Sequence, residues 1–365
     1  MLTDHQLEEV AALRRRLHAC PERPGQETRT RAVLTAFLRE NTSLEVRDMG
    51  GWLLATHFEG EALPHMGFRA DMDALPLQAP AGAADHRCGH DGHSAILCGL
   101  AMMLEGRRTG RNVHLIFQAS EETGTGARQV IDSWPRLDRL QALYALHNIP
   151  GFPKGAVLVR RGCFACASCG HIVEMTGRPA HAAYPSDGAN PIEALCALTL
   201  EVPRMIETVL AGNGRLLMRT PIALEAGSED FGISAHAGRL LQTLRGHRQA
   251  DIQRLMELIE LRARALGERE GLACRFEVRD VFPDTTGDDD LYEDALRRFR
   301  AAGLPVLQLD EPMRWSEDFG WLLKAVPGLY FGIGAGEDCP GLHTEGYAFD
   351  DGLIAPALKA FEALL

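Results

Sequence analysis

Apolar runs of strand length alternate with amphipathic helical segments over most of the chain. A first helix is predicted where the apolar residues of "LEEVAALRRRL" recur at helical spacing behind a capping box of Thr3 and Gln6. Further helices are predicted at 27–41, 93–105, 127–134, 289–302, 317–325 and 352–365, and strands at 51–58, 65–70, 112–119, 142–148, 305–309 and 328–334. Such alternation predicts an α/β fold with helices covering both faces of a largely parallel sheet.

The middle of the chain has a different texture. Strand-like segments "HIVEMTG", "RLLQTLR" and "CRFEVRDVF" are separated by a helix that starts at Pro191, with Asn190 as its cap, and by a second helix at 250–270. A chain of 365 residues is also longer than one core usually supports. We therefore predict an inserted domain at 164–282, within a larger domain made of 1–163 and 283–365.

Composition narrows the range of partners. The net charge of -12 argues against a nucleic-acid backbone or an anionic membrane surface as partner. No apolar run approaches the roughly 20 residues that a membrane span needs, and the stretch "MLTDHQLEEV" does not resemble a signal peptide. The nine cysteines fit reduced thiols better than a disulfide framework. Together these features predict a cytoplasmic protein that binds neither nucleic acid nor membrane.

Potential metal ligands follow several of the predicted strands. In open α/β sheets ligands bind beyond the carboxyl ends of the strands, so polar residues at these positions are the first candidates. They are Asp71 and Asp73, the cluster Cys88–His93, Glu121 and Glu122, His147, and His343. Any one of them could be a satisfied or solvated polar group. Cysteine, histidine and carboxylate are the ligand types of zinc and related ions. Five candidate ligands, more than one closed tetrahedral site holds, indicate two ions; they are Cys88, His90, Glu122, His147 and His343.

The adjacent pair Glu121 and Glu122 predicts a division of labour. Neighbouring side chains near a strand end point in different directions. One carboxylate can therefore bind metal while the other acts as a general base in hydrolysis.

Seven collinear motifs resemble those of the M20 metallopeptidases, in particular their amidohydrolase subfamily of aminoacylase-type, hippurate-hydrolase-like and auxin-conjugate-hydrolase-like enzymes. The motifs are "RRRLHACPE", "FRADMDALPLQ", "CGHDGHSA", "EETGTGA", "ALHNIPGFPKGAV", "GRPAHAAYP", and "SEDFGWLL" followed by "GLHTEGYAFDDGLI". The resemblance implies an aminopeptidase-like α/β catalytic domain with an inserted ferredoxin-like α+β lid that also serves dimerisation.

Carried over residue by residue, the resemblance implies two divalent ions per subunit. It favours zinc or manganese, with cobalt or nickel as alternatives. The implied ligands are Cys88, which would bridge the ions, His90, Glu122, His147 and His343. It also implies that Glu121 is the general base and that His181 polarises the scissile carbonyl, often from the partner subunit of a dimer. Asp71, Asp73 and Asp91 would orient ligands from behind.

Other features of the sequence are less specific. Arg245 could bind a substrate carboxylate, although a structural or solvated role is equally compatible with its position. His93 is expected to be structural. The segment 227–238 and Trp315 depart from the usual subfamily pattern around the substrate. Three cysteines in "GCFACASCG" are spaced like half of a zinc or iron–sulfur motif, but strand alternation would send the middle one to the opposite face, so they are not assigned to a site.

The sequence therefore predicts a metal-dependent amidohydrolase that cleaves N-acyl amino acids, with N-acetyl substrates favoured. One alternative is a dipeptidase or carboxypeptidase of the same superfamily; Cys88 and His90, in place of the acidic ligand typical of those peptidases, favour the acyl amino acid. A second alternative is a homologue that binds metal or ligand without catalysis.

Overall fold

The computed structural model describes residues 1–80 and 82–365, which form two compact units. Unit 1 consists of Met1–Phe164, Thr285–Pro312 and Asp318–Leu365, and unit 2 consists of Ala165–Asp284 and Met313–Glu317. Among the helices of this described part, none is long and apolar enough to cross a membrane.

Unit 1 is built on an eight-stranded sheet. Its order is β1 (Glu45–Asp48), β2 (Leu53–His57), β6 (Asn112–Gln118), β3 (His65–Asp71), β7 (Leu140–Pro150), β16 (Gly328–Gly336), β8 (Val157–Val159) and β15 (Val306–Gln308). Strands β6, β3, β7 and β16 are parallel to one another, whereas β2 runs antiparallel to both β1 and β6, and β8 runs antiparallel to β16. The predicted parallel sheet is thus confirmed at its centre, while its margins are mixed.

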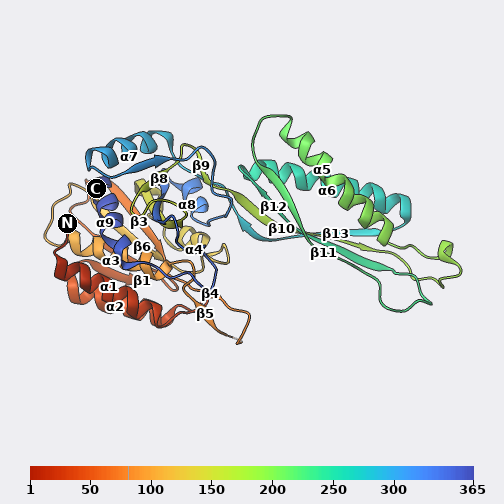
Figure 1. Ribbon diagram of the computed structural model, residues 1–365, viewed down its shortest axis with the longest axis horizontal. Coiled ribbons are helices and arrows are strands. Elements are labelled where there is room, and N and C mark those ends of the chain that lie inside the picture. The colour runs from red at the N-terminus through yellow and green to blue at the C-terminus, as the bar shows by residue number, and fades with distance from the viewer. Residues whose placement is uncertain (81) are drawn as a thin grey trace. The chain divides into compact units, whose positions relative to one another are not determined.

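Helices pack on this sheet because its central strands are buried throughout. In β6, Val113, Leu115 and Phe117 join the main hydrophobic core, and Ile116 between them is buried as well. The helices are α1 (Asp4–His18), α2 (Thr28–Asn41), α3 (His90–Leu104), α4 (Gly126–Ser133), α7 (Asp289–Ala301), α8 (Gly320–Ala325) and α9 (Ile354–Leu364). The fully buried α3 packs against β3, α1, α2 and α9 (Figure 1).

Two predicted helices begin three residues away from the expected position. Helix α3 starts at His90, three residues before the predicted start, because Gly89 adopts a left-handed conformation and acts as its N-cap. Helix α8 starts only at Gly320 rather than at Glu317. The backbone before α8 makes a tertiary contact, because the Asp318 N–H donates to the Glu121 carboxylate.

Small ladders complete this part of the fold. Strands β4 (Leu75–Pro76) and β5 (Ala84–Asp85) pair with each other, and β9 (Cys163–Ala165) pairs with β14 (Thr285–Thr286) where the chain passes between the units.

Unit 2 contains an antiparallel four-stranded sheet of order β11-β12-β10-β13, with two helices on one face (Figure 1). Its elements are β10 (Ala167–Thr176), α5 (Ile192–Leu210), β11 (Leu217–Ala226), β12 (Ala237–Gly246), α6 (Gln249–Glu270) and β13 (Ala273–Phe282). The chain order βαββαβ with this strand order is the ferredoxin-like arrangement.

The sequence pattern missed strand β11. This strand contains Pro221, which cannot donate a ladder hydrogen bond, and most of its side chains are exposed. It lies at the edge of the sheet, and its pairing with β12 shifts register between Pro221 and Ala223. Proline is tolerated at such edge positions and bulges, so an apolar or alternating pattern was not required for this strand to form.

Candidate metal and catalytic site

The central parallel strands of unit 1 bring the predicted ligands to one edge of the sheet. Strand β3 ends at Asp71 beside Gln118, the last residue of β6, so Asp73 and Glu121–Glu122 follow neighbouring strand ends. His147 lies within β7, opposite Gly332 of β16, and His343 lies in the loop after β16. Parallel strands end at the same edge, which is why residues far apart in sequence meet here.

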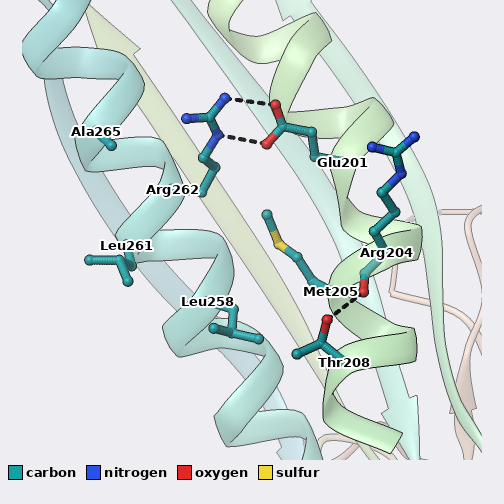
Figure 2. A pocket seen from close by; sticks show the side chains of 8 residues that line it. All are labelled: Glu201, Arg204, Met205, Thr208, Leu258, Leu261, Arg262 and Ala265. Carbon is teal, nitrogen blue, oxygen red and sulfur yellow. Dashed lines mark hydrogen bonds and ion pairs between the residues drawn. The ribbon is translucent and has the colours of Figure 1, made fainter. Parts of the chain in front are cut away.

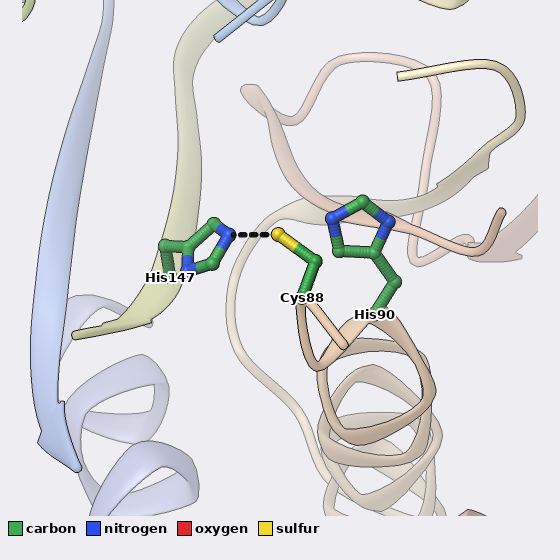
Figure 3. A group of neighbouring side chains, drawn as sticks. All are labelled: Cys88, His90 and His147. Atoms are coloured by element: carbon green, nitrogen blue, oxygen red, sulfur yellow. Dashed lines mark hydrogen bonds between the residues drawn. The ribbon is translucent and has the colours of Figure 1, made fainter. Parts of the chain in front are cut away.

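Cys88 lies at the centre of the group. Its Sγ is 3.4 Å from Nε2 of His147 and 3.4 Å from Nε2 of His343. Figure 3 shows the Cys88 and His147 side chains pointing toward each other, with the ring of His90 beside them at the start of α3. The thiol is almost completely buried.

The other predicted ligands join Cys88 in overlapping groups. Nε2 of His343 lies 3.4 Å from Oε1 of Glu122. Three sets of potential donor atoms each lie within 4.8 Å of one another: Cys88, His90 and His147; Cys88, Glu122 and His343; and His90, Glu121 and Glu122. All five predicted ligands and the predicted base therefore belong to one cluster, which we call the ligand cluster.

Backbone and carboxylate contacts orient the rings of the ligand cluster. Nδ1 of His90 donates to the Asp73 carbonyl at 3.0 Å, and Nδ1 of His147 donates to the Asn148 carbonyl at 2.7 Å. These bonds leave Nε2 of each ring for the cluster. The Asp73 carboxylate accepts the Glu122 N–H at 3.0 Å. This is the kind of outer support that fixes ring orientation around metals.

The pKa shifts follow from burial among charges. Burial raises the pKa of Cys88 to about 12 and lowers the pKa of His147 well below its ordinary value. Burial alone would also lower the pKa of His90, but Asp71, Cys88 and Asp73 together outweigh burial and raise that pKa. Burial would raise the pKa of Asp71, yet His90, His93 and Arg69 together hold it low. The protein without metal thus uses protonated groups to balance its buried carboxylates.

The residues of the cluster fit divalent cations. Among the described residues, Nε2 of His90 and Oδ1 of Asp73 are buried and have no hydrogen-bond partner. Buried polar atoms are nearly always hydrogen-bonded, so these two atoms point to a missing ligand. A cation would satisfy the imidazole lone pair directly, and thiolate, imidazole and carboxylate donors are those that zinc and related ions use.

Glu121 is held beside the cluster by a segment that comes much later in the chain. Its Oε1 accepts the backbone N–H of Asp318 at 3.3 Å. The Asp318 carboxylate is itself anchored by Arg69 at 3.0 Å, by Gln118 at 2.8 Å and by the N–H of Ala127 at 2.8 Å. Neither Arg69 nor Asp318 was a predicted site residue. Their only signal was membership in the motifs "FRADMDALPLQ" and "SEDFGWLL".

Asp91 does not contact the predicted ligands through its hydrogen bonds. It is buried in the first turn of α3 and accepts from Nδ1 of His18 at 2.9 Å and from Arg14 at 3.4 Å. Its clearest role is to tie α1 to α3. His93, by contrast, contacts Asp71 at 2.6 Å from Nδ1, and its ring packs against that of His147.

Two predicted site residues belong to unit 2. His181 is exposed, and its Nδ1 accepts the Ala183 N–H at 3.0 Å. Arg245 donates from Nη1 to the Arg314 carbonyl and to Oγ of Ser316, at 2.5 and 2.7 Å. Arg245 therefore has a structural contact with the returning segment 313–317, and substrate binding by either residue stays a prediction.

The remaining candidates are not associated with the ligand cluster. Among the residues described, no group of potential metal ligands includes Cys163, Cys166 or Cys169. A hollow of about 450 Å³ lies between α5 and α6, where Glu201 and Arg262 form a two-pronged ion pair beside Met205 and neighbouring leucines (Figure 2). None of the described residues that line this hollow is a predicted site residue.

The fold and the ligand cluster are typical of metal-dependent hydrolases with an α/β fold, and comparison with known families gives the specific family. Residues 67–365 match the model of peptidase family M20/M25/M40, so the chain belongs to that family. The predicted resemblance is thereby confirmed.

Two relatives that the chain matches over nearly its full length are named as deacetylases. The chain is 29% identical to an N-acetyldiaminopimelate deacetylase of Shouchella clausii, over 98% of both chains. It is 25% identical to the N-acetylcysteine deacetylase of Bacillus subtilis, over 96% of this chain and 94% of that one.

Solved structures agree on the fold. A putative aminohydrolase from methicillin-resistant Staphylococcus aureus superimposes with a TM-score of 0.86 at 22% identity, covering 98% of this chain and 96% of the other. The Bacillus subtilis YXEP protein, described as a dinuclear metal-binding peptidase of the M20 family, gives 0.82 at 23% identity over 99% and 98%. The predicted fold class is confirmed.

Proposed function

We propose that this protein is a metal-dependent amidohydrolase that cleaves the amide bond of N-acyl amino acids, with N-acetyl substrates preferred. One observation carries the proposal: the Glu121 carboxylate lies in the same buried group as His90 and Glu122 in a chain of the M20 family. A second carboxylate beside metal-type ligands is what hydrolysis by an activated water requires. Relatives that deacetylate N-acetyldiaminopimelate and N-acetylcysteine support the substrate class.

Cys88, His90, Glu122, His147 and His343 would hold two divalent ions. The metals supply a water of lowered pKa and an electrophile for the amide oxygen. Zinc or manganese is favoured. The buried thiol of Cys88 favours the softer zinc, and cobalt or nickel could replace either ion.

Glu121 acts as the general base and then as the general acid in this proposal. It accepts a proton from the attacking water and returns it to the leaving amine as the carbon–nitrogen bond breaks. The Asp318 N–H on Oε1 orients the carboxylate for that exchange. His181 would donate a hydrogen bond to the carbonyl oxygen as negative charge develops there, either from this chain or from a partner copy.

Arg245 is the proposed partner of the substrate carboxylate. A guanidinium has five N–H donors in a planar fork. The contacts with Arg314 and Ser316 would then orient the group that binds the substrate.

We further propose a cytoplasmic homodimer that forms through unit 2. All nine cysteines are free thiols, as expected in a reducing compartment. Unit 2 also exposes large apolar side chains, including Phe231 and Ile233, which a second copy could cover. Equilibrium sedimentation tests this part independently of catalysis.

A hydrolysis screen tests the activity. The protein is freed of metal, loaded in turn with zinc, manganese, cobalt and nickel, and assayed on N-acetyl amino acids alongside dipeptides and longer N-acyl amino acids. Release of acetate from N-acetyl amino acids, at a kcat/KM well above that for dipeptides, is the expected result. Preferred cleavage of dipeptides would assign the alternative peptidase function. Metal binding without any turnover would indicate an inactive homologue.

A further inference from the structure

A buried hydrogen bond joins two side chains that the proposed mechanism does not use. Nδ2 of Asn148 donates to the hydroxyl of Tyr347 at 2.5 Å, across 199 positions of sequence. Asn148 directly follows His147, and Tyr347 lies four residues after His343. Each partner is therefore close in sequence to a proposed metal ligand.

The other end of the Asn148 amide continues the connection. Its Oδ1 lies 2.5 Å from Nε2 of His93, and Nδ1 of His93 lies 2.6 Å from the Asp71 carboxylate. Four side chains thus form one buried chain of polar contacts: Asp71, His93, Asn148 and Tyr347. They come from the end of β3, the first turn of α3, strand β7 and the loop after β16. These are the segments that carry Asp73, His90, His147 and His343.

The same amide and phenol lie directly against the turn that carries Cys88. Gly89 has φ of +95°, and a Cβ placed on it would come within 2.5 Å of Asn148 Oδ1 and 2.7 Å of the Tyr347 hydroxyl. The turn can approach this closely only because residue 89 has no side chain. A side chain at residue 89 would therefore displace Asn148 or Tyr347.

His343 is the proposed ligand whose placement depends most on such support. Its φ of +65° is unfavourable for a residue with a side chain, so the surrounding structure must hold it there. Its side chain is half exposed, whereas His90 is buried. The His343 N–H donates to the Arg87 carbonyl at 2.8 Å, and the Tyr347 N–H closes the turn that directly follows, onto the Thr344 carbonyl.

We propose that Tyr347 is a positioning residue whose hydroxyl, bonded to Asn148, holds the His343 turn against Cys88 and His147. The inference rests on the proposed dinuclear site. It assigns Tyr347 no chemical step. Loss of the hydroxyl frees the turn from strand β7, which lets His343 leave its strained conformation. The ion that His343 binds is then held more weakly, whereas the ion held by ligands on α3 and β7 keeps its affinity.

Titration of the metal-free full-length protein with Co²⁺ tests this proposal. Absorption of the thiolate–cobalt and ligand-field bands reports two successive dissociation constants. In Tyr347→Phe the larger of the two dissociation constants is expected to rise by about tenfold or more. This is the usual effect of removing a hydrogen bond that orients a metal ligand. The smaller dissociation constant should stay near wild type. The thermal unfolding midpoint without metal should fall no further than in a control variant that loses a comparable buried hydrogen bond. Tyr292→Phe is the matched control. Tyr292 lies on helix α7, away from the ligand cluster, and its hydroxyl also accepts a hydrogen bond from a side-chain amide, that of Gln308 in β15.

A second variant, Asn148→Leu, breaks the connection from the other side. It should raise the same Co²⁺ dissociation constant, even if Tyr347→Phe folds poorly. The proposal would be overturned if the two Co²⁺ dissociation constants were the same in wild type and in both variants. It would also be overturned if both constants rose equally, or if the unfolding midpoint fell while the metal affinity stayed unchanged. If the wild type itself does not bind two ions, the proposed dinuclear site fails instead. The two failures are therefore distinguishable.

Discussion

Arg69 and Asp318 form a fully buried ion pair, with Nη2 of the guanidinium 3.0 Å from Oδ1 of the carboxylate across 249 positions of sequence. Nη1 of the same guanidinium donates to Asp71 at 2.7 Å. Asp71 contacts His93 behind the predicted ligands, and the Asp318 N–H orients Glu121. One cation therefore links the support of the ligand cluster to the support of the proposed base.

Asp318→Asn should destabilise the protein by about 3 kcal/mol, because the buried Arg69 then loses a carboxylate partner. Urea unfolding followed by circular dichroism measures the loss. The control is Glu225→Gln, which breaks an exposed ion pair with Arg239 and should cost less than about 1 kcal/mol. Equal stability of Asp318→Asn and wild type would mean that the pair contributes no net stabilisation.

Glu121→Gln should keep the metal content of the wild type and lower kcat by about 10²- to 10⁴-fold, because the amide cannot accept the proton from the attacking water. Metal content is measured by mass spectrometry and turnover by release of acetate. Glu337→Gln changes an exposed carboxylate of the same unit and should leave both values unchanged. Undiminished turnover of Glu121→Gln with metal bound would exclude Glu121 as the base.

Metal binding should release the thiol proton of Cys88, and the metal affinity should therefore increase as pH rises. Burial raises the pKa of this thiol to about 12, so it is protonated without metal at neutral pH, whereas the bound ligand is the thiolate. Each proton released makes the affinity rise about tenfold per pH unit. Calorimetry in two buffers of different ionisation enthalpy counts the protons. Cys88→Ala should release about one proton fewer, and an identical count would contradict the assignment.

His171 should make unit 2 acid-sensitive. Its ring is fully buried, and burial lowers its pKa to about 4. The Gln242 amide donates to Nδ1 at 3.1 Å, and Arg219 holds the Gln242 oxygen, so a proton on Nδ1 would face a donor. The unfolded chain takes up this proton near pH 6.5, before the folded protein does. Stability should therefore fall by about 3 kcal/mol between pH 6.5 and about 4.

Denaturant unfolding at several pH values checks this slope. His171→Asn offers an amide oxygen to Gln242 but does not titrate, so its stability should change less with pH over this range. His5→Asn replaces an exposed histidine of α1 and should keep the wild-type slope. A slope that is identical in wild type and His171→Asn would show that His171 does not cause the acid sensitivity.

The central elements of the fold could be predicted because their signals are local. The runs "NVHLIFQA" and "GLYFGIG" are buried on both faces and are largely apolar for that reason. Each run therefore predicts a strand by itself. Strand β11 gave no such signal, because an edge strand with Pro221 needs only the neighbouring β12 to form. Its existence was decided by pairing, which no local pattern records.

The candidate ligands were predictable for a related reason, since strand ends at one sheet edge converge whatever the loops do. The sequence by itself determined which residues could bind metal and that Glu121 adjoins Glu122. Only the tertiary structure decided what holds them: Asp318 on Glu121, Arg69 on Asp318, and Tyr347 on Asn148. Hydrogen bonds and ion pairs need matched atoms within about 3 Å. Residues that are 197 to 249 positions apart therefore become partners only when the packed chain places them in contact.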